Sequence, residues 1–376
     1  MNIIDTYNPV IKSLLALIRM GIGNESGLMS DRVDWEIIKD LAARQELTAV
    51  VLDGIEALRE GESNVSFPEK KVLTQWIGEV LQGYEYRYEL YRRAIAEMAG
   101  FFNRHGYKIM ILKGYACSLD WPKPEHRPCG DIDIWQFGKQ MEADELLAKE
   151  KNIDIDSSHH HHTVYFWRDF MVENHYDFVN VHDYKSSIEL ERIFKVLGKD
   201  DSYSTELYGE KVYLPSPNLH ALFLIRHLVA HFASTSITLR QLLDWAFFAK
   251  THVKTIDWEW LQEVLTKFKM RDVYNCFNGI CVEDLGFDSS MFNGVTFNPP
   301  LKDRVLNDIL NPKYGVVEPD GFLKKLSYKL QRWNSNAWKR QLCYEDNKIE
   351  AFIRNVWAHI IKPSSFWSNK RHSGYD

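Results

Sequence analysis

The sequence predicts an α+β protein in which a small mixed β-sheet lies between helical N-terminal and C-terminal regions. Apolar residues recur at helical spacing over residues 8–104 and again from about residue 217 onward. Between them, residues 109–178 contain short β-branched or alternating runs that are typical of strands. In this stretch, the expected order is a strand, a turn and a short helix, followed further on by a helix, a strand, a turn and a second strand. This order favours a small mixed sheet over a doubly wound one.

The N-terminal region is expected to be helical. Asn8 and Pro9 are typical of a helix start and Gly21 of a helix end. The expected helices cover residues 8–20, Asp34 to about Leu41, 47–59 and about 69–104. The aromatic residues at helical spacing in the last of these are expected to be core rather than a ligand site.

A short apolar strand and a glycine turn open the central stretch of the chain. Ile109 to Leu112 has the length and β-branched content of a buried strand, and Lys113-Gly114 ends it. Glycine can adopt positive φ and lets a ligand approach the backbone closely. A short helix over residues 115–120 would point its N-terminal amides at this turn, so the pattern predicts an anion-binding site.

Two acidic residues define the second strand of this stretch. Asp131 and Asp133 are two apart in an alternating run that ends at Trp135, so both project from one face of the strand. Neighbouring carboxylates repel each other unless a cation lies between them, and hard oxygen ligands suit Mg²⁺. The sequence therefore predicts a divalent-metal strand. The alternative is an edge strand whose acids face water.

A third carboxylate is expected on the hairpin that follows. The further elements expected are a helix at 138–150, a short strand at 153–155, hairpin strands at 163–167 and 170–178, a helix at 188–197 and a strand at 212–214. Alternation places Glu173, His175 and Asp177 on one face of the second hairpin strand. Either acid could complete the site, and Glu173 is the preferred candidate.

Two groups of histidines are candidates for metal binding. They are the run His159–His162 and the stripe His220, His227 and His231. The run predicts either a zinc site completed by His175 or His182, or a polar strand edge near the active-site cleft. The stripe, on a helix expected over residues 217–234, indicates either a transition-metal site or half-buried, hydrogen-bonded side chains.

Four regions are expected along the chain. Their boundaries are 1–105 for the N-terminal helical region, 106–215 for the sheet core, 216–310 for the C-terminal helical region and 311–376 for a basic, Trp-rich helical tail. The later helices are expected at about 237–251, 257–268 and 271–284. The tail is expected to cover apolar surface with long Lys and Arg stems.

Composition and charge narrow the class of protein. Because the net charge is −6, no general nucleic-acid-binding surface is expected. Five cysteines without a CxxC spacing argue against a disulfide framework or zinc knuckle and fit a reducing cytosol. No apolar run is long enough for a transmembrane helix and the first residues are not typical of a signal peptide, so a cytoplasmic protein is expected.

Three segments carry a family resemblance. They are Leu112-Lys113-Gly114, Arg127 to Ile134 and Val172 to Tyr176. Together with Leu239 to Asp244, they resemble the bacterial family labelled uncharacterised nucleotidyltransferase, within the DNA polymerase β nucleotidyltransferase superfamily. The resemblance covers roughly residues 70–250. It implies a polymerase-β-like nucleotidyltransferase core at residues 106–215.

The resemblance also implies a role for each candidate site residue. Asp131, Asp133 and Glu173 would be the catalytic metal ligands, with Glu173 as third ligand or base. The residues implied in substrate binding are Lys113, Gly114, Tyr115, Arg127, His175 and Arg240. Two positions depart from the family pattern, since Tyr115 replaces a small residue in the turn and Asn174 replaces a hydrophobic residue in the strand of the third acid.

Three of the basic candidates have structural alternatives. Lys113 also fits an exposed lysine in a turn, and Arg127 fits a surface arginine in a Pro-rich loop. Arg240 and Asp244 are four residues apart, so they can pair on one helix.

The activity implied is transfer of a nucleoside monophosphate from an NTP such as ATP to an unknown acceptor hydroxyl. Mg²⁺ is the expected cofactor, with Mn²⁺ as an alternative, and the acceptor is a small molecule, a protein or an RNA. The alternative is a catalytically inactive nucleotide-binding or antitoxin-like regulatory protein of the same fold. A metal-dependent hydrolase that uses the histidines is a weaker alternative. Three carboxylates within metal-bridging range would favour the transferase. Glu173 and Asp177 both pointing away from Asp131 and Asp133 would favour the inactive protein.

Overall fold

The computed structural model describes residues 9–25, 29, 32–60, 65–182, 184–314, 319 and 321–346. The chain forms two compact units, each assembled from three segments. The helical unit comprises Met1–Tyr88, Ser118–Pro128 and Leu224–Tyr344, and the sheet unit comprises Glu89–Cys117, Cys129–Phe223 and Glu345–Asp376. The four region boundaries expected from the sequence stay a prediction.

The described part of the helical unit contains helices and no strand. Its elements are α1 (Pro9–Gly21), α2 (Trp35–Arg44), α3 (Thr48–Glu60), α4 (Lys70–Val80), η2 (Leu81–Tyr86), η3 (Pro124–His126), α10 (Leu239–His252), α11 (Trp258–Lys267), α12 (Arg271–Glu283), η4 (Ser289–Phe292), α13 (Pro299–Leu310), α14 (Phe322–Ser335) and α15 (Ala337–Cys343). The side chain of Asp34 accepts a hydrogen bond from the amide of Ile37, which is the N-cap that its position predicts.

The helix predicted over about residues 69–104 is interrupted. It consists of α4, the six-residue π-helical segment η2, and α5 (Arg87–Arg104). Leu81 and Arg87, at the two joints, keep right-handed helical dihedrals. A π-helical segment has about one more residue per turn than an α-helix, but it is built from the same kinds of residue. The spacing of apolar residues therefore does not reveal it.

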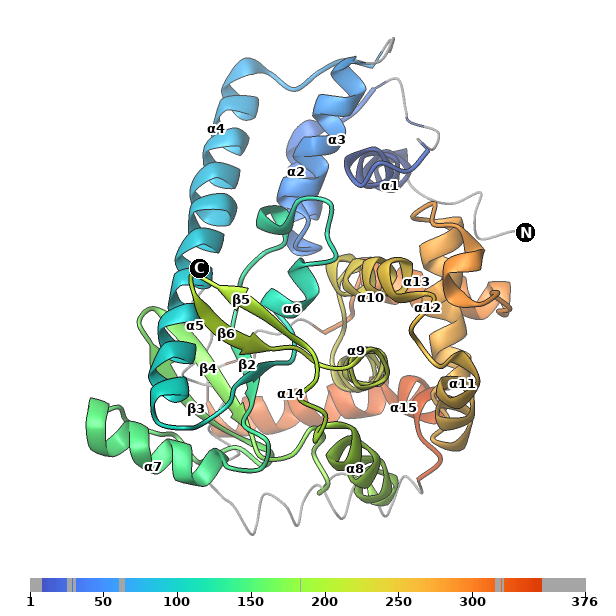
Figure 1. Ribbon diagram of the computed structural model, residues 1–376. Coiled ribbons are helices and arrows are strands. Elements are labelled where there is room, and N and C mark those ends of the chain that lie inside the picture. Colours follow the sequence, from blue (N-terminus) through green and yellow to red (C-terminus); the bar gives the residue numbers. More distant parts are fainter. Residues whose placement is uncertain are drawn as a thin grey trace. The chain divides into compact units, whose positions relative to one another are not determined.

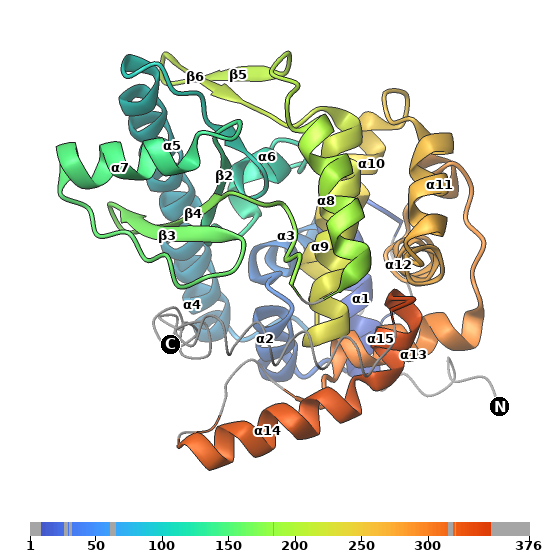
Figure 2. The same cartoon turned by 90° about the horizontal axis from the view of Figure 1, so that it is seen from below.

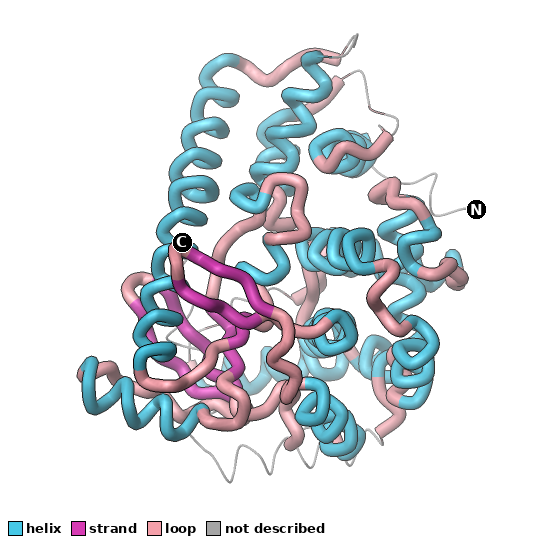
Figure 3. The backbone as a smooth tube through the Cα atoms, viewed as in Figure 1, coloured by secondary structure: helices cyan, strands magenta, loops and turns pink. Residues whose placement is uncertain are grey.

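All strands that the structure describes belong to one six-stranded mixed sheet in the sheet unit (Figures 1 and 3). The strands are β1 (Met110–Ile111), β2 (Ile132–Trp135), β3 (His162–Trp167), β4 (Phe170–His175), β5 (Ser204–Leu207) and β6 (Glu210–Tyr213), in the order β3-β4-β2-β1-β6-β5. β2 pairs antiparallel with β1 and parallel with β4, whereas β3 and β4 form an antiparallel hairpin. The predicted α+β class with a small mixed sheet is confirmed.

β5 is the strand that the sequence analysis missed. It joins β6 through a two-residue turn, Tyr208-Gly209, in which both φ angles are positive. Asn-Gly and Asp-Gly are the usual signals for such a turn, and tyrosine is not one of them. Conversely, the short strand predicted at residues 153–155 is only an isolated bridge at Asp156.

Aromatic contacts place helices on the sheet. The helices of the sheet unit are α5, α6 (Tyr115–Ser118), α7 (Gln140–Lys151) and α8 (Lys185–Leu197), and α9 (Pro217–Ser234) begins in this unit. Tyr91 of α5 packs edge-on against Phe170 of β4, with ring centroids 5.2 Å apart. Trp135 at the end of β2 packs on Phe178, which stacks on Phe194 of α8. Figure 2 shows the hairpin strands β3 and β4 side by side. Because Phe170 alternates with the residues on either side of it, α5 leaves the opposite face of β4 for the polar side chains described below.

No described helix combines the length and the apolar character that crossing a bilayer requires. Of the basic, Trp-rich tail expected at 311–376, the structure describes residues 311–314, 319 and 321–346, which contain the helices α14 and α15. The remainder of that tail lies outside the described residues.

Candidate active site

The strand register brings two of the predicted acids, Asp133 and Glu173, side by side. β2 and β4 run parallel with Asp133 paired to Glu173, and Asp131 directly precedes β2. The two paired carboxylates project from the face opposite α5, because each alternates with residues of the other face. Asp177 lies beyond the end of β4 and forms an ion pair with Lys195 at 3.0 Å. Of the two acids considered from the sequence, Glu173 is thus the one beside Asp133.

Asp133 has contacts that fit a cation site. Its Oδ1 lies 3.1 Å from the Nζ of Lys113 and 3.2 Å from the Nε2 of His175. Its Oδ2 is buried and finds no hydrogen-bond partner among the residues described. Ligand atoms of Asp133, Glu173 and His175 all lie within 4.8 Å of one another, close enough to hold one metal ion. A buried oxygen is normally satisfied, so the unpaired Oδ2 is an acceptor that a further ligand would satisfy.

The charges of this group set one another's pKa values. Burial would lower the pKa of Lys113, but the surrounding carboxylates outweigh it and raise that pKa. Burial would raise the pKa of Asp133, but Lys113 and His175 hold it well below its usual range. Burial, together with the charges of Asp131 and Asp133, raises the pKa of Glu173 well above its usual range. One lysine therefore leaves excess negative charge in the group, which a divalent cation would neutralise.

Gly114 ties the predicted phosphate turn to the acidic strand. Its φ is +57°, and a Cβ at this position would come within 2.1 Å of the Tyr91 hydroxyl. That hydroxyl donates a hydrogen bond of 2.9 Å to the carbonyl of Asp131. Glycine is required here both for the left-handed conformation and for the approach of Tyr91.

Tyr115, the departure in the turn, is accommodated inside the sheet unit. Its side chain is 4% exposed, at the start of the short helix α6. Burial raises the pKa of the Tyr115 hydroxyl, and a hydrogen bond with Arg92 opposes that shift. The ring is therefore packed between protein groups, and the backbone turn at Gly114 keeps its conformation beside it.

Asn174, the departure in β4, has a structural role on the face that α5 covers. It is fully buried, and its side-chain amide donates hydrogen bonds of 2.8 Å to Gln136 and to Asp144 of α7. Asp144 also accepts a hydrogen bond of 2.7 Å from the Thr163 hydroxyl of β3. This network holds α7 against the end of the hairpin. Because Asn174 lies on the opposite face of β4, its polar side chain leaves the face that carries the acids unchanged.

The two candidate arginines belong to the helical unit, where a shared carboxylate binds both. Arg127 donates to Asp244 from Nε at 2.8 Å and from a terminal nitrogen at 3.0 Å. Arg240 donates to Asp244 at 2.7 Å and to Glu46 at 2.7 Å. The pairing of Arg240 with Asp244 that the sequence offered as an alternative is present, and burial makes Arg127 an internal rather than a surface residue. Their substrate-binding roles stay predictions.

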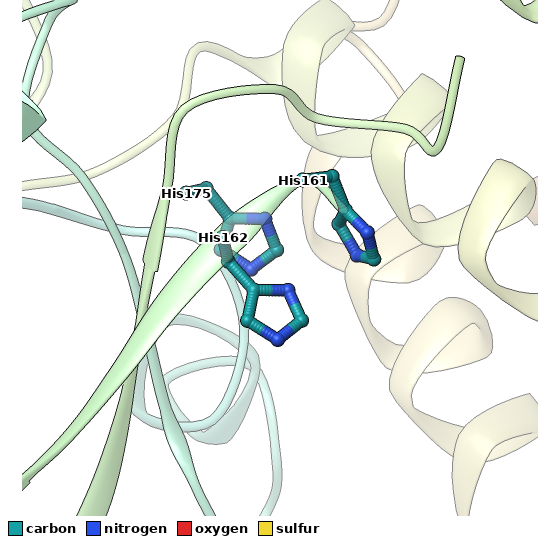
Figure 4. Close-up of side chains that lie close together, drawn as sticks. All are labelled: His161, His162 and His175. Carbon is teal, nitrogen blue, oxygen red and sulfur yellow. The ribbon is translucent and has the colours of Figure 1, made fainter. Parts of the chain in front are cut away.

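The hairpin register also brings histidines to the acidic face. His162 pairs directly with His175, and ligand atoms of His161, His162 and His175 lie within 4.8 Å of one another (Figure 4). Alternation from Glu173 through His175 was visible in the sequence, but the pairing of His162 with His175 depends on the hairpin register. Within the described residues, the histidine stripe of α9 supplies no member to such a group.

These features define an α+β protein whose sheet carries a group of acidic and imidazole ligands able to hold a divalent cation. The profile of the family described as uncharacterised nucleotidyltransferase matches residues 31–283, a range that includes every candidate site residue. The chain belongs to this family of transferases.

One solved structure is similar to part of the chain. It is an antigenic nucleotidyltransferase-like protein from Paracoccidioides brasiliensis, with 17% sequence identity and a TM-score of 0.31, over 42% of this chain and 74% of the other. No curated protein matches the sequence significantly.

Proposed function

We propose that the protein is a Mg²⁺-dependent nucleotidyltransferase of the DNA polymerase β superfamily, which transfers a nucleoside monophosphate from an NTP to an acceptor hydroxyl. The observation that carries the proposal is the pairing of Asp133 with Glu173 on adjacent strands, with Asp131 just before β2. Family membership supports the reaction class.

Asp131, Asp133 and Glu173 would hold the metal ion. The unpaired Oδ2 of Asp133 and the excess negative charge of the group fit a divalent cation. Mg²⁺, or Mn²⁺ in its place, would neutralise charge on the triphosphate when bound. All three ligands are carboxylates, which favours these hard ions over softer metals.

The protein's own groups would position the substrates. The acceptor oxygen forms a bond to the α-phosphorus, the bond from that phosphorus to the bridging oxygen breaks, and pyrophosphate leaves. Glu173, whose ionised form a cation at this group would favour, would take the proton of the acceptor hydroxyl or serve as third ligand. The groups proposed to bind the nucleotide are Lys113, Gly114, Tyr115, Arg127, His175 and Arg240. Lys113 would exchange its ion pair with Asp133 for the phosphates.

A screen of the four NTPs with Mg²⁺ or Mn²⁺ tests the proposal. The readouts are pyrophosphate release and transfer of label to small molecules, protein and RNA. The double variant Asp131→Asn, Asp133→Asn is expected to lose Mg²⁺-dependent NTP binding and turnover. Unchanged binding and turnover in this variant would refute the proposed site.

A catalytically inactive nucleotide-binding or antitoxin-like protein is the second candidate. The contact that favours it is the ion pair of Lys113 with Asp133, since a lysine already neutralises the acid that a metal would need. Such a protein would bind an NTP with the same affinity in the presence and absence of Mg²⁺ and release no pyrophosphate, whereas the transferase requires the metal.

A further inference from the structure

A second group of ligands lies on the face that carries the acids. His162 is the first residue of β3 and pairs with His175, the last residue of β4, while His161 precedes the strand. The ring centroids of His161 and His162 are 4.4 Å apart, and those of His162 and His175 are 5.3 Å apart (Figure 4). Two strands in register thus hold three imidazoles together, with two of the rings fixed by sheet pairing.

Several ring nitrogens of this group make no hydrogen bond within the protein. Nδ1 of His161 and both ring nitrogens of His162 are buried without a hydrogen bond to any residue that the structure describes. His162 is 5% exposed and His175 is 4% exposed. Folded proteins rarely leave several buried polar atoms unpaired at one place unless water or an ion satisfies them. These atoms therefore point to a bound ligand that accepts imidazole nitrogens.

Carboxylates stand beside two of the rings. The Nε2 of His175 lies 3.2 Å from Asp133, and the Nε2 of His162 lies 3.7 Å from Glu173. A carboxylate at hydrogen-bond distance, as Asp133 is from His175, commonly orients a metal-binding histidine. Glu173 is too far from His162 for a hydrogen bond and contributes only its charge. The same acids therefore serve as neighbours of the histidine group and as ligands of the proposed Mg²⁺ site.

The ligand type separates the two groups. Imidazole nitrogen is a poor ligand for Mg²⁺ and a good one for Zn²⁺ and neighbouring transition metals. Three histidines with a remaining open position are the ligand set of many zinc sites. We propose that His161, His162 and His175 bind one Zn²⁺ ion beside the carboxylate site, with which this group shares His175. This inference does not require the proposed transferase activity.

A zinc titration of the full chain tests the inference. The protein is stripped with chelator, and Zn²⁺ binding is measured by competition with a chromophoric indicator. One equivalent is expected to bind tightly. His161→Ala and His162→Ala are each expected to weaken binding by at least about tenfold, which is the loss seen when even a residue that only supports a ligand is removed. His160→Ala, in the same run but outside the group, is the matched control and is expected to leave the affinity unchanged.

Circular dichroism of each variant separates loss of metal binding from loss of fold. His161 is less buried than His162, so the His161 variant keeps the test decisive if the His162 variant unfolds. The inference is overturned if the wild-type chain binds no zinc, if the folded His161 variant binds it as tightly as the wild type, or if His160→Ala weakens binding as much as His161→Ala.

Discussion

At the scale of single residues, Lys113 is the cation around which the acids are arranged. Its ammonium contacts Asp133, and both side chains are largely buried, at 15% and 2% exposed. The carboxylates raise the pKa of Lys113, so it stays charged at neutral pH. A divalent metal ion at the same carboxylates would compete with this lysine, which makes the Lys113 ion pair a direct probe of the proposed site.

Replacing Lys113 with methionine is expected to destabilise the metal-free protein and to increase its response to Mg²⁺. Removing one partner of a buried ion pair costs about 3–5 kcal/mol, because the remaining charge is left uncompensated. The free energy of unfolding, measured by urea denaturation with and without Mg²⁺, checks this. Mg²⁺ should restore more stability to Lys113→Met than it adds to the wild type.

Lys108→Met is the matched control, since Lys108 forms an exposed ion pair with Asp201. Little change in stability and no added response to Mg²⁺ are expected there. Equal responses of the two variants to Mg²⁺ would argue that no metal competes for the acids.

At the scale of secondary-structure elements, a helix of only a few residues is held in place by polar side-chain contacts. The three-residue helix η3 carries His126, whose Nδ1 lies 2.6 Å from Asp53 of α3 and whose Nε2 lies 3.3 Å from Glu85 of η2. Lys123 contacts the other oxygen of Asp53 at 2.6 Å. Burial would lower the pKa of His126, but the two acids outweigh it and raise that pKa above its ordinary value. The two acids thus favour the protonated form of the imidazole that holds the Pro-rich loop.

This arrangement predicts a pH-dependent contribution to stability. A folded-state pKa raised above the unfolded value gives stability that is full below the unfolded pKa and is lost as pH rises through the folded pKa. His126→Gln should therefore be more destabilising at about pH 6 than at about pH 9. Lys123→Gln removes a contact with the same Asp53. Because the wild-type lysine stays charged over this pH range, the stability lost in this variant should be nearly constant. A His126 variant with a cost independent of pH would contradict the prediction.

At the scale of the whole molecule, both units are built from interleaved segments. The sheet unit begins at Glu89, so most of α5 belongs with the sheet rather than with the helices before it in sequence. Tyr91, Phe101 and Phe102 of α5 are buried. Phe101 packs against Trp167 of β3 with ring centroids 5.8 Å apart. A fragment that contains the sheet therefore needs α5 to cover one face of it.

The dependence on α5 predicts how fragments behave. A fragment of residues 89–223 retains most of α5 and the six strands that the structure describes, whereas one of residues 106–215 has these strands without the helix. Each aromatic side chain left uncovered costs about 1.5–3 kcal/mol, so several exceed what a marginally stable fold can lose. Cooperative thermal unfolding, followed by near-UV circular dichroism, is expected for the longer fragment alone. Cooperative unfolding of the 106–215 fragment would support the boundary expected from the sequence.

Much of this architecture follows from local patterns. Apolar spacing and caps predicted the helices, and alternation predicted β2 and the β3–β4 hairpin. The Tyr208-Gly209 turn and the π-helical segment were missed because neither uses the residue types that normally signal it.

The acidic residues of the candidate site could be predicted from the sequence, whereas the residues that the fold brings next to them could not. Two-residue spacing placed Asp131 with Asp133, but the pairing of Asp133 with Glu173 depends on strand order, which no single segment encodes. The long-range pairing of Arg127 with Asp244 and the gathering of His162 with His175 are likewise tertiary.

The central claim is that three carboxylates, Glu173 among them, form a metal-dependent NTP site. Since the acceptor is unknown, the most direct measurement is calorimetric binding of the NTPs with and without Mg²⁺ to the wild type, Glu173→Gln and Asp177→Asn. The account predicts that Glu173→Gln weakens Mg²⁺-dependent binding by about 10–100-fold, whereas Asp177→Asn, which removes the acid paired with Lys195, leaves it unchanged. Equal Mg²⁺-dependent affinity in the wild type and Glu173→Gln, or an equal loss in both variants, would contradict it.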